Sequence, residues 1–572
     1  MLRSALRAAA RCVRPRFATL IRRMPLVTLA AIVPSALASA LASALASALA
    51  PASTSASRAI AVDAAPDAAP PNIVLFLVDD LGQQDASVPM LAEASALNRR
   101  YRTPNLERLA ARGVRFSNAY AAAPVCTPSR TAILTGQSPA RTHITYWTLH
   151  KDTDNSSRHP TLEAPKWAVN GAQPAPTNLP EVLRAAGYRT IHAGKAHWGA
   201  RGTPGADPLA MGFDVNIAGH AAGAPGSFLG TDHFKDNGRK QRGKVAPADA
   251  EPSVWDVPGL EKWHGDDIWL DDAIARDACD AISAAVADGK PFYLSLATYG
   301  VHAPIMRDAR FVGDYADLDP TEAAYASMVA AYDEALGQVV ARCEALGVLD
   351  RTVIVFTGDN GGLSAHARGA APDGKKAHTH NAPLRSGKGS AYEGGVRVPF
   401  VVAGPGVAPR AAPVDAPIVG TDLYPTILAL AGLAPPEGHA LDGVDLTGLL
   451  ARGAAPAERT IVFTQPHKWG PTGPGIEPFT AIRRGDWKLL FFHDPARAGA
   501  RYELYDVAQD PGETLDLAPR EPARLAAMVA ELRAEIARTG LQLSIDKATG
   551  APVTLPEPAA GDAPSSAAPN AS

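Results

Sequence analysis

Oxygen ligands stand at the ends of two apolar runs in this sequence. Asp79 and Asp80 end the run NIVLFLV, and Asp359 and Asn360 follow the run TVIVFTG. Such ligands suit Ca²⁺ or Mg²⁺ and not zinc or copper, since no His and Cys pair stands at ligand spacing. Either pair alone is better explained by acids that cap helices or face water. The two pairs together predict a site for a hard divalent cation.

A cysteine begins the polar segment CTPSRTAILTG. Thr127 is expected to cap a helix, with Pro128 as its first residue and Gly136 as its stop. Cys126 then lies just before a helix N-terminus, which favours an anion and lowers a thiol pKa, and Arg130 offers a fork suited to a tetrahedral oxyanion. The segment predicts a nucleophilic cysteine, although an ordinary half-exposed cysteine beside a solvated arginine explains it equally well.

Cations and imidazoles follow other apolar runs. Lys195 and His197 stand two residues apart in GKAHWG, so an extended backbone would point both to one side. His302 follows PFYLSLATY, and Lys388 follows a glycine that lets the backbone approach a ligand. Each alone is more often a surface charge or a satisfied histidine. Their common place after strand ends favours one site, because ligands of open α/β sheets bind beyond the carboxyl ends of the strands.

These side chains need a sheet that brings distant segments to one edge. Short continuous apolar runs, which fit strands buried on both faces of a parallel sheet, recur at residues 72–80, 188–194, 291–299, 352–360 and 398–404. Helical segments such as 179–187 and 321–347 lie between them. The alternation predicts an α/β fold with a doubly wound, mostly parallel sheet.

The N-terminal segment is predicted to be an export signal. The first 24 residues carry seven Arg and no acid, and an apolar run with A-x-A sites continues to Ala50. This pattern predicts a signal peptide over residues 1–50 in preference to a membrane anchor. Arg22 and Arg23 resemble a twin-arginine signal. We therefore expect an exported protein, located in a bacterial periplasm.

Composition divides the rest of the chain. We predict a linker at 51–71, a catalytic domain at 72–456, a smaller C-terminal α+β domain at 457–545 and a disordered tail at 546–572. The α+β prediction rests on antiparallel strand patterns followed by one helix, at residues 461–466, 479–492, 501–507 and 521–538.

Charge and cysteine content exclude some classes of protein. The 55 Lys and Arg nearly balance the 58 Asp and Glu of the 572 residues, so no strong field favours nucleic acid or an acidic membrane surface, and we expect neither as a partner. Four cysteines are too few for a disulfide scaffold. Cys279 and Cys343 are expected to be buried thiols, with a bond between them left open. The sequence predicts no oligomeric state.

Together these segments resemble the type I sulfatases of the alkaline phosphatase superfamily, from Asn72 to about Asp516. The stretch from Cys126 to Arg130 matches the family signature Cys-x-Pro-Ser-Arg. The other family positions are filled in order by Asp79, Asp80, Lys195, His197, His302, Asp359, Asn360 and Lys388. An ordered set of this kind is far more specific than the short signature alone.

The resemblance implies an alkaline-phosphatase-like fold and a cysteine that a maturation enzyme oxidises. Cys126 would become formylglycine (3-oxoalanine), whose hydrated aldehyde attacks the sulfur of a sulfate ester. The implied metal is Ca²⁺, with Mg²⁺ as the alternative. Its implied ligands are the formylglycine and Asp79, Asp80, Asp359 and Asn360.

The resemblance also implies roles for the remaining residues. Arg130 and Lys195 would steady the formylglycine and its oxyanion. His302 and Lys388 would bind the sulfate, with Lys195, and assist the leaving alcohol. His197 would take a proton from the second hydroxyl, so that sulfate leaves and the aldehyde is restored.

Within the family, residues 202–230 and 378–395 resemble bacterial carbohydrate sulfatases. We hypothesise a sulfated sugar such as galactose or N-acetylgalactosamine 4-sulfate, contacted by His378, His380 and Arg385. A loop merely rich in polar residues explains these three nearly as well. The alternatives are a broad arylsulfatase, a phosphonate monoester or phosphodiester hydrolase of the same superfamily, and a non-catalytic protein that binds sulfated glycans.

Overall fold

The computed structural model describes residues 69–236, 252–364, 368 and 379–558. The predicted signal peptide and nearly all of the predicted linker lie outside these residues. The described chain belongs to one compact unit that begins at residue 65. Among the described residues, no helix combines the length and the apolar character that a membrane crossing needs.

A seven-stranded sheet has the strand order β2-β9-β8-β1-β7-β5-β6. Its parallel strands, in order across the sheet, are β8 (Thr352–Gly358), β1 (Asn72–Val78), β7 (Phe292–Ala297), β5 (Arg189–Gly194) and β6 (Val215–Ile217). At the other edge, β9 (Phe400–Ala403) runs antiparallel to β8 and to β2 (Gly113–Arg115). The structure confirms the predicted α/β fold with a mostly parallel sheet.

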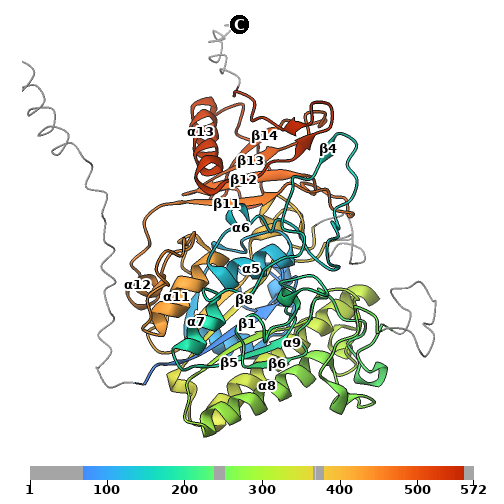
Figure 1. Cartoon of the computed structure of the whole chain (residues 1–572), viewed down its shortest axis with the longest axis vertical. Helices are drawn as coiled ribbons and strands as arrows, with labels where there is room; N and C mark the ends of the chain where they lie inside the picture. The colour runs from blue at the N-terminus through green and yellow to red at the C-terminus, as the bar shows by residue number, and fades with distance from the viewer. Residues whose placement is uncertain (1–68, 237–251, 365–367, 369–378, 559–572) are drawn as a thin grey trace, which may run out of the picture. The chain divides into compact units, whose positions relative to one another are not determined.

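Alternate residues of β1 belong to two apolar cores, one on each face of the sheet. Val74 and Phe76 pack in the core that contains α8 (Leu270–Ala287) and α9 (Pro320–Ala345). Ile73 and Leu75 pack in the core that contains α5 (Cys126–Thr135), α7 (Leu179–Ala185), α11 (Leu423–Leu430) and α12 (Thr447–Arg452). Figure 1 shows α8 and α9 on one side of the sheet and α5, α7 and α11 on the other. Because helices cover both faces, the strands are apolar throughout.

A second, antiparallel sheet is built from the C-terminal part of the chain. Its strands are β11 (Thr460–Gln465), β12 (Phe479–Arg484), β13 (Trp487–Phe492) and β14 (Tyr502–Asp506), and α13 (Pro522–Thr539) follows them. Phe463 and Phe479 of this sheet share an apolar core with Tyr120 and Tyr392, which lie earlier in the sequence. The C-terminal sheet therefore completes its core with residues of the predicted catalytic domain.

The predicted disordered tail needs a correction at its start. Strand β15 (Ile545–Asp546) pairs with β16 (Ala551–Pro552) and with β4 (Leu162–Glu163). Val553 is buried in the core beside α13. Composition alone missed this order, because it comes from pairing with a strand that lies far away in the sequence. Residues 559–572 lie outside the described part of the chain.

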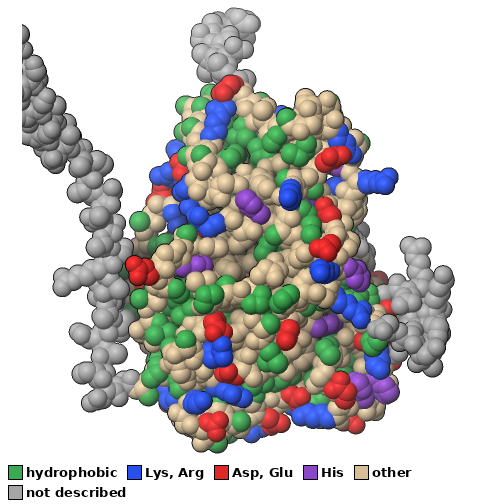
Figure 2. Space-filling model, in the orientation of Figure 1, with side chains coloured by type: hydrophobic (Ala, Val, Ile, Leu, Met, Phe, Trp, Pro, Cys, Tyr) green, Lys and Arg blue, Asp and Glu red, His purple; other side chains and the backbone are tan. Residues whose placement is uncertain are grey.

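Shorter elements connect these layers. They are α3 (Ala96–Arg100), α4 (Pro104–Ala111), β3 (Ala119–Tyr120), α6 (Pro139–Thr142), α10 (Glu393–Val396), β10 (Ile418–Val419) and the 3-10 helices Pro204–Ala206, Gly230–Asp232, Glu261–Trp263, Val312–Tyr315, Leu349–Arg351 and Gly420–Asp422. Basic and acidic side chains are interspersed over the described residues in view in Figure 2. This face therefore carries charges of both signs, in agreement with the near balance of the composition.

Candidate active site

The carboxyl ends of four parallel strands bring the predicted residues together. Asp79 and Asp80 directly follow β1, Asp359 and Asn360 follow β8, and Lys195 follows β5. The loop after β7 is fixed to the end of β1, because Asp79 N donates to Gly300 O at 3.2 Å and Val301 N donates to Asp79 O at 2.9 Å. This edge of the sheet is where ligands of doubly wound folds bind.

Oxygen ligands cluster at this edge. Ligand atoms of Asp79, Asp80, Cys126 and Asp359 all lie within 4.8 Å of one another, and all four residues are buried. Asn360 Nδ2 donates to Asp80 Oδ1 at 2.8 Å, while Asn360 Oδ1 is buried and has no hydrogen-bond partner among the described residues. Three carboxylates with one orphaned amide oxygen form the donor set of a hard cation. The residues present therefore fit a divalent ion such as Ca²⁺.

Three buried cations are paired with these carboxylates. Lys195 Nζ lies 2.6 Å from Asp79 Oδ2, and Lys388 Nζ lies 2.7 Å from Asp80 Oδ1. Arg130 Nε donates to Asp359 Oδ2 at 2.7 Å, and its Nη1 donates to the carbonyl of Lys195 at 2.7 Å. Arg130 thus joins Asp359, at the end of β8, to the loop after β5. Its contacts are those of a residue that positions the carboxylates.

Burial dominates the titration of Asp79. It raises the pKa of this carboxyl well above its ordinary value, although Lys195 lowers that pKa, and the nearby carboxylates of Asp359 and Asp80 raise it further. By contrast, Arg130 and Lys195 hold the pKa of Asp359 below its ordinary value against the opposing effect of burial. Carboxylates this close repel one another, so a cation among them would lower the free energy of the ionised cluster.

The helix that carries Cys126 begins at that residue, with Val125 as its N-cap, and ends at Thr135, with Gly136 as its C-cap in the left-handed region. The expectation of Thr127 as N-cap is therefore wrong by two residues, whereas Gly136 is the predicted stop. The predicted lowering of the thiol pKa is also wrong. Burial raises the pKa of Cys126 to about 12, since it outweighs the lowering by Lys195 and Lys388.

The side chain of His197 has a defined tautomer. Its Nε2 lies 2.9 Å from the carbonyl oxygen of Thr148, which can only accept, so Nε2 carries the proton and Nδ1 the lone pair. Nδ1 has no hydrogen-bond partner among the described residues. Burial lowers the pKa of His197 well below its ordinary value, and Lys195 lowers it further. His197 is therefore a neutral imidazole with a base at Nδ1.

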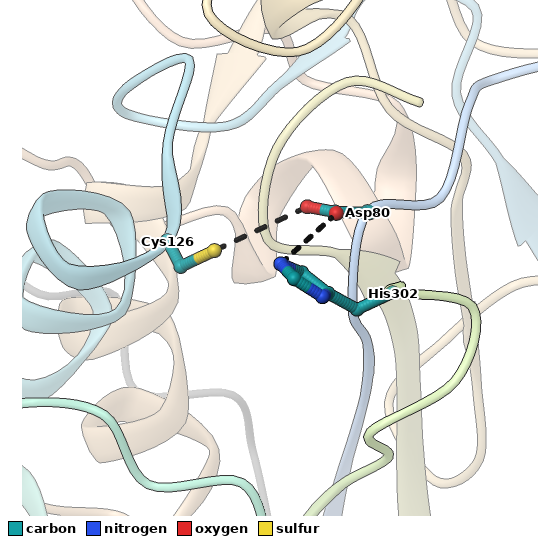
Figure 3. A group of neighbouring side chains, drawn as sticks. All are labelled: Asp80, Cys126 and His302. Atoms are coloured by element: carbon teal, nitrogen blue, oxygen red, sulfur yellow. Dashed lines mark hydrogen bonds and ion pairs between the residues drawn. The ribbon is translucent and has the colours of Figure 1, made fainter. Parts of the chain in front are cut away.

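His302 approaches the cluster from the loop after β7. Its Nδ1 lies 2.7 Å from the carbonyl oxygen of Ala303 and therefore donates to it. Its Nε2 lies 3.6 Å from Asp80 Oδ2, and its side chain is 22% exposed. Figure 3 shows Cys126, Asp80 and His302 pointing toward one another, with dashed lines from Asp80 to Cys126 and to His302. His302 therefore lies between the buried carboxylates and the solvent-accessible side of the site.

A pocket of about 260 Å³ opens onto Cys126. Its described lining residues are Val125, Cys126, Trp147, Leu149, His197, Gly223, Ala224, Trp255, His302, Lys388 and Trp469. Sequence reasoning missed its three tryptophans. The signal available for them was a large aromatic residue in each of the loop segments WTLH, SVWDV and HKWG.

Comparison with known proteins identifies the family. Residues 71–433 match the sulfatase family, and residues 387–541 match the C-terminal region of N-sulphoglucosamine sulphohydrolase. The chain belongs to the sulfatase family. This confirms the resemblance predicted from the ordered motif, and the chain is an enzyme of the sulfatase class.

Curated relatives and solved structures agree with this assignment. The sulfatase is 32% identical over 402 residues to N-acetylgalactosamine-6-sulfatase of Sus scrofa, covering 69% of this chain and 68% of the relative. It is 31% identical over 479 residues to arylsulfatase A of Homo sapiens, covering 78% and 83%. The crystal structure of Ps i-CgsB has a TM-score of 0.64 and 27% identity, covering 81% of this chain and 92% of that one.

Of the three residues hypothesised as sugar contacts, the two that the structure describes, His380 and Arg385, are not among the residues that line this pocket of the sulfatase. The Arg385 guanidinium lies 3.8 Å from the centre of the Tyr392 ring, and its Nη1 donates to the carbonyl of Glu513 at 2.9 Å. His380 is fully buried, with Nε2 3.8 Å from Glu322 Oε1. His378 lies outside the described residues. Arg385 and His380 thus contact other residues of the protein, and their role as sugar contacts stays a prediction.

The two remaining described cysteines of the sulfatase are buried free thiols. Cys279 lies on α8 and Cys343 on α9, and neither forms a disulfide. The expectation of buried thiols is confirmed, and the bond left open between them is absent from the described structure.

Proposed function

We propose that this sulfatase hydrolyses O-sulfate esters of sugars with a formylglycine that a maturation enzyme makes from Cys126. The observation that carries the proposal is a thiol among hard ligands, with Cys126 Sγ 3.7 Å from Asp79 Oδ1 and a pKa raised to about 12. Such a thiol is a poor nucleophile near neutral pH and a poorly matched ligand for a hard cation. A hydrated aldehyde at position 126 would supply one oxygen for the cation and another for attack on sulfur.

We propose Ca²⁺ as the metal, with Mg²⁺ as the alternative. Asp79, Asp80, Asp359 and Asn360 would hold it together with residue 126. The cation would neutralise charge on the sulfuryl oxygens during the reaction. The chain's own lysines support the same task, because Lys388 Nζ lies 3.4 Å from Cys126 Sγ, in reach of an anion bound there.

Two histidines have geometries that suit proton transfer. His197 lines the same pocket as Cys126, and its Nε2 donates to Thr148 O, so Nδ1 is the atom that would accept a proton from the group at position 126. His302 donates from Nδ1 to Ala303 O, so its Nε2 is the atom that can deliver a proton to the leaving alcohol. Asp80 lies beside that Nε2 and would stabilise the protonated ring.

Sugars are the substrate class that the relatives support. N-acetylgalactosamine-6-sulfatase carries the sugar in its name, and Ps i-CgsB was also solved in complex with k-i-k-neocarrahexaose. We propose a galactose or N-acetylgalactosamine sulfate for this chain, with the sulfate at position 4 or 6. Assays of both regioisomers beside an aryl sulfate test this, and activity on the aryl ester alone would contradict it.

Mass spectrometry of the tryptic peptide from Phe116 to Arg130 tests the nucleophile. In protein purified from its native host, we expect the lower mass of formylglycine at position 126. A free thiol at full occupancy would refute the mechanism. Cys126→Ala should abolish turnover while the thermal unfolding curve stays cooperative.

The competing chemistry is hydrolysis of phosphonate or phosphate diesters. An aryl sulfate and an aryl phosphonate of the same phenol, assayed side by side, separate the two. We expect the larger kcat/KM on the sulfate, and a large excess on the phosphonate would overturn the assignment.

We also propose that the chain is exported through the signal predicted in residues 1–50. Fractionation of the native host should place activity in the periplasm. Activity confined to the cytoplasm would contradict this.

A further inference from the structure

Three tryptophans from separate loops line the pocket that opens onto Cys126. Trp147 precedes β4, Trp255 precedes α8, and Trp469 lies between β11 and β12. We propose that these rings form a stacking subsite for the sugar ring that carries the scissile sulfate. The inference rests on the proposed function, because the proposed function places the sulfate at residue 126. The subsite would bind the rest of the substrate.

The pocket is divided by polarity. Its described titratable lining residues are Cys126, His197, His302 and Lys388, and the other described lining residues are uncharged. Cys126, His197 and Lys388 are at most 5% exposed, whereas the three tryptophans are half-buried. These three titratable groups thus form the floor of the pocket, and the aromatic rings lie nearer the solvent. An ester whose anionic end reaches the floor must place its organic part against the rings.

Trp469 is fixed beside the cation expected to bind sulfate. Its ring centre lies 5.9 Å from Lys388 Nζ. A Cβ added at Gly389 would lie 2.1 Å from Trp469 Cε3, so the ring rests directly on the backbone that follows Lys388. The Trp469 ring is a flat apolar surface at this distance from the ammonium expected to bind sulfate. It is in reach of a sugar ring whose nearest ring atom is two bonds from the sulfur in a 4-sulfate and three in a 6-sulfate.

The size and chemistry of the pocket favour a single sugar ring. Its volume of about 260 Å³ lies below the ~300–1,000 Å³ typical of small-molecule sites. A pyranose has C–H groups on its faces and hydroxyls around its edge, so a face can pack on an aromatic ring while the edge stays solvated. The ring of an aryl sulfate would present the same kind of flat face. The experiment below distinguishes sugar sulfates from aryl sulfates as ligands of the subsite.

Binding to the inactive Cys126→Ala protein, measured by calorimetry with Ca²⁺ present, tests the subsite without requiring formylglycine. The probes are galactose 6-sulfate, N-acetylgalactosamine 4-sulfate, phenyl sulfate and ethyl sulfate, which has no ring. In this background, Trp469→Ala should raise the Kd of a sugar sulfate about tenfold and that of ethyl sulfate less than about twofold. Trp469→Phe should retain most of the sugar affinity, and Trp147→Ala and Trp255→Ala should each weaken it.

Trp487→Ala is the matched control. This half-buried tryptophan lies on β13, outside the pocket, with the Arg524 guanidinium 4.9 Å from its ring centre. We expect no change in any Kd. An equal loss for ethyl sulfate and the sugar sulfates would overturn the stacking subsite, as would no loss at all. Binding of phenyl sulfate but of neither sugar sulfate would overturn the assignment to sugars. Failure of turnover in the mature enzyme, with sugar binding intact, would refute the proposed function alone.

Discussion

His197 Nε2 donates a hydrogen bond to the carbonyl oxygen of Thr148 at 2.9 Å, which leaves Nδ1 as the only basic atom of the ring. The imidazole is held in this orientation by close contact with Gly223. A Cβ built at Gly223 would lie 2.3 Å from His197 Cε1. The position of the base therefore depends on a residue that has no side chain.

We predict that Gly223→Ala displaces His197 and lowers kcat by about 100-fold or more, the range lost with a general base. The fold should persist, because Gly223 does not adopt a positive φ. Gly313→Ala is the matched control, since a Cβ there meets no atom within 4 Å. Steady-state kinetics on an aryl sulfate decide the matter, and wild-type kcat in Gly223→Ala would contradict the role given to His197.

Lys195→Met should destabilise the protein strongly. Lys195 and Asp79 are fully buried and 2.6 Å apart, and removal of one partner of such a pair costs about 3–5 kcal/mol. Without Lys195, which lowers the pKa of Asp79, burial would raise that pKa further and favour the protonated carboxyl. Lys262→Met removes a lysine whose side chain is 55% exposed and pairs with Asp277, and it should cost less than about 1 kcal/mol. Urea unfolding of both variants gives the comparison, and equal losses would argue against a tightly coupled buried pair.

Removal of the metal should abolish activity and lower the thermal midpoint. Carboxylate oxygens of Asp79, Asp80 and Asp359 lie within 4.8 Å of one another, so the site without a cation retains their repulsion. Treatment with a calcium chelator, followed by readdition of Ca²⁺, Mg²⁺ or Zn²⁺, tests the choice of ion. We expect Ca²⁺ to restore more activity than Mg²⁺ or Zn²⁺. The Asn360→Ala variant should need a higher Ca²⁺ concentration for the same recovery of activity. Full activity after exhaustive chelation would exclude a metal-dependent site.

The stability of the protein should depend on the ionisation of Asp271. This carboxylate accepts from Tyr299 N at 2.9 Å and Gly300 N at 3.1 Å, and burial raises its pKa to about 7. A carboxyl whose pKa is raised on folding contributes stability that is full below its unfolded pKa of about 3.9 and is lost as pH rises through its folded pKa. We expect Asp271 to contribute a decline of up to about 1.4 kcal/mol per pH unit between about pH 4 and 7.

Asp271→Asn should remove this decline, and urea unfolding at several pH values measures it. Asp280→Asn, at an exposed position of the same helix, is the control and should leave the pH dependence unchanged. An identical pH dependence for Asp271→Asn and wild type would show that Asp271 does not take up the proton.

The sequence predicted the sheet, and it predicted that polar residues meet at one edge of it, because both features follow from patterns within single segments of the chain. Continuous apolar runs mark strands covered on both faces, and β1, β5, β7 and β8 lie where those runs predicted. The acids after β1 and β8 meet because the carboxyl ends of parallel strands share one edge. The ordered motif then sufficed to identify the sulfatase family.

Other features depended on contacts between distant segments, and these the sequence did not reveal. The pKa of Cys126 rises because the surrounding loops bury it, although its helix position alone predicted a fall. Arg385 packs on the ring of Tyr392, a contact that the sequence of its polar loop did not predict. The start of the predicted tail is ordered because β15 pairs with β4.

The sequence by itself thus determined which elements form and which residues end them. Only the tertiary structure decided how deeply each group is buried and which loops meet over Cys126. The physical reason is that strand and helix patterns reflect hydrogen bonding and burial along a single segment. Desolvation, tautomer choice and the meeting of Trp147, Trp255 and Trp469 arise from packing between segments that lie far apart in the chain.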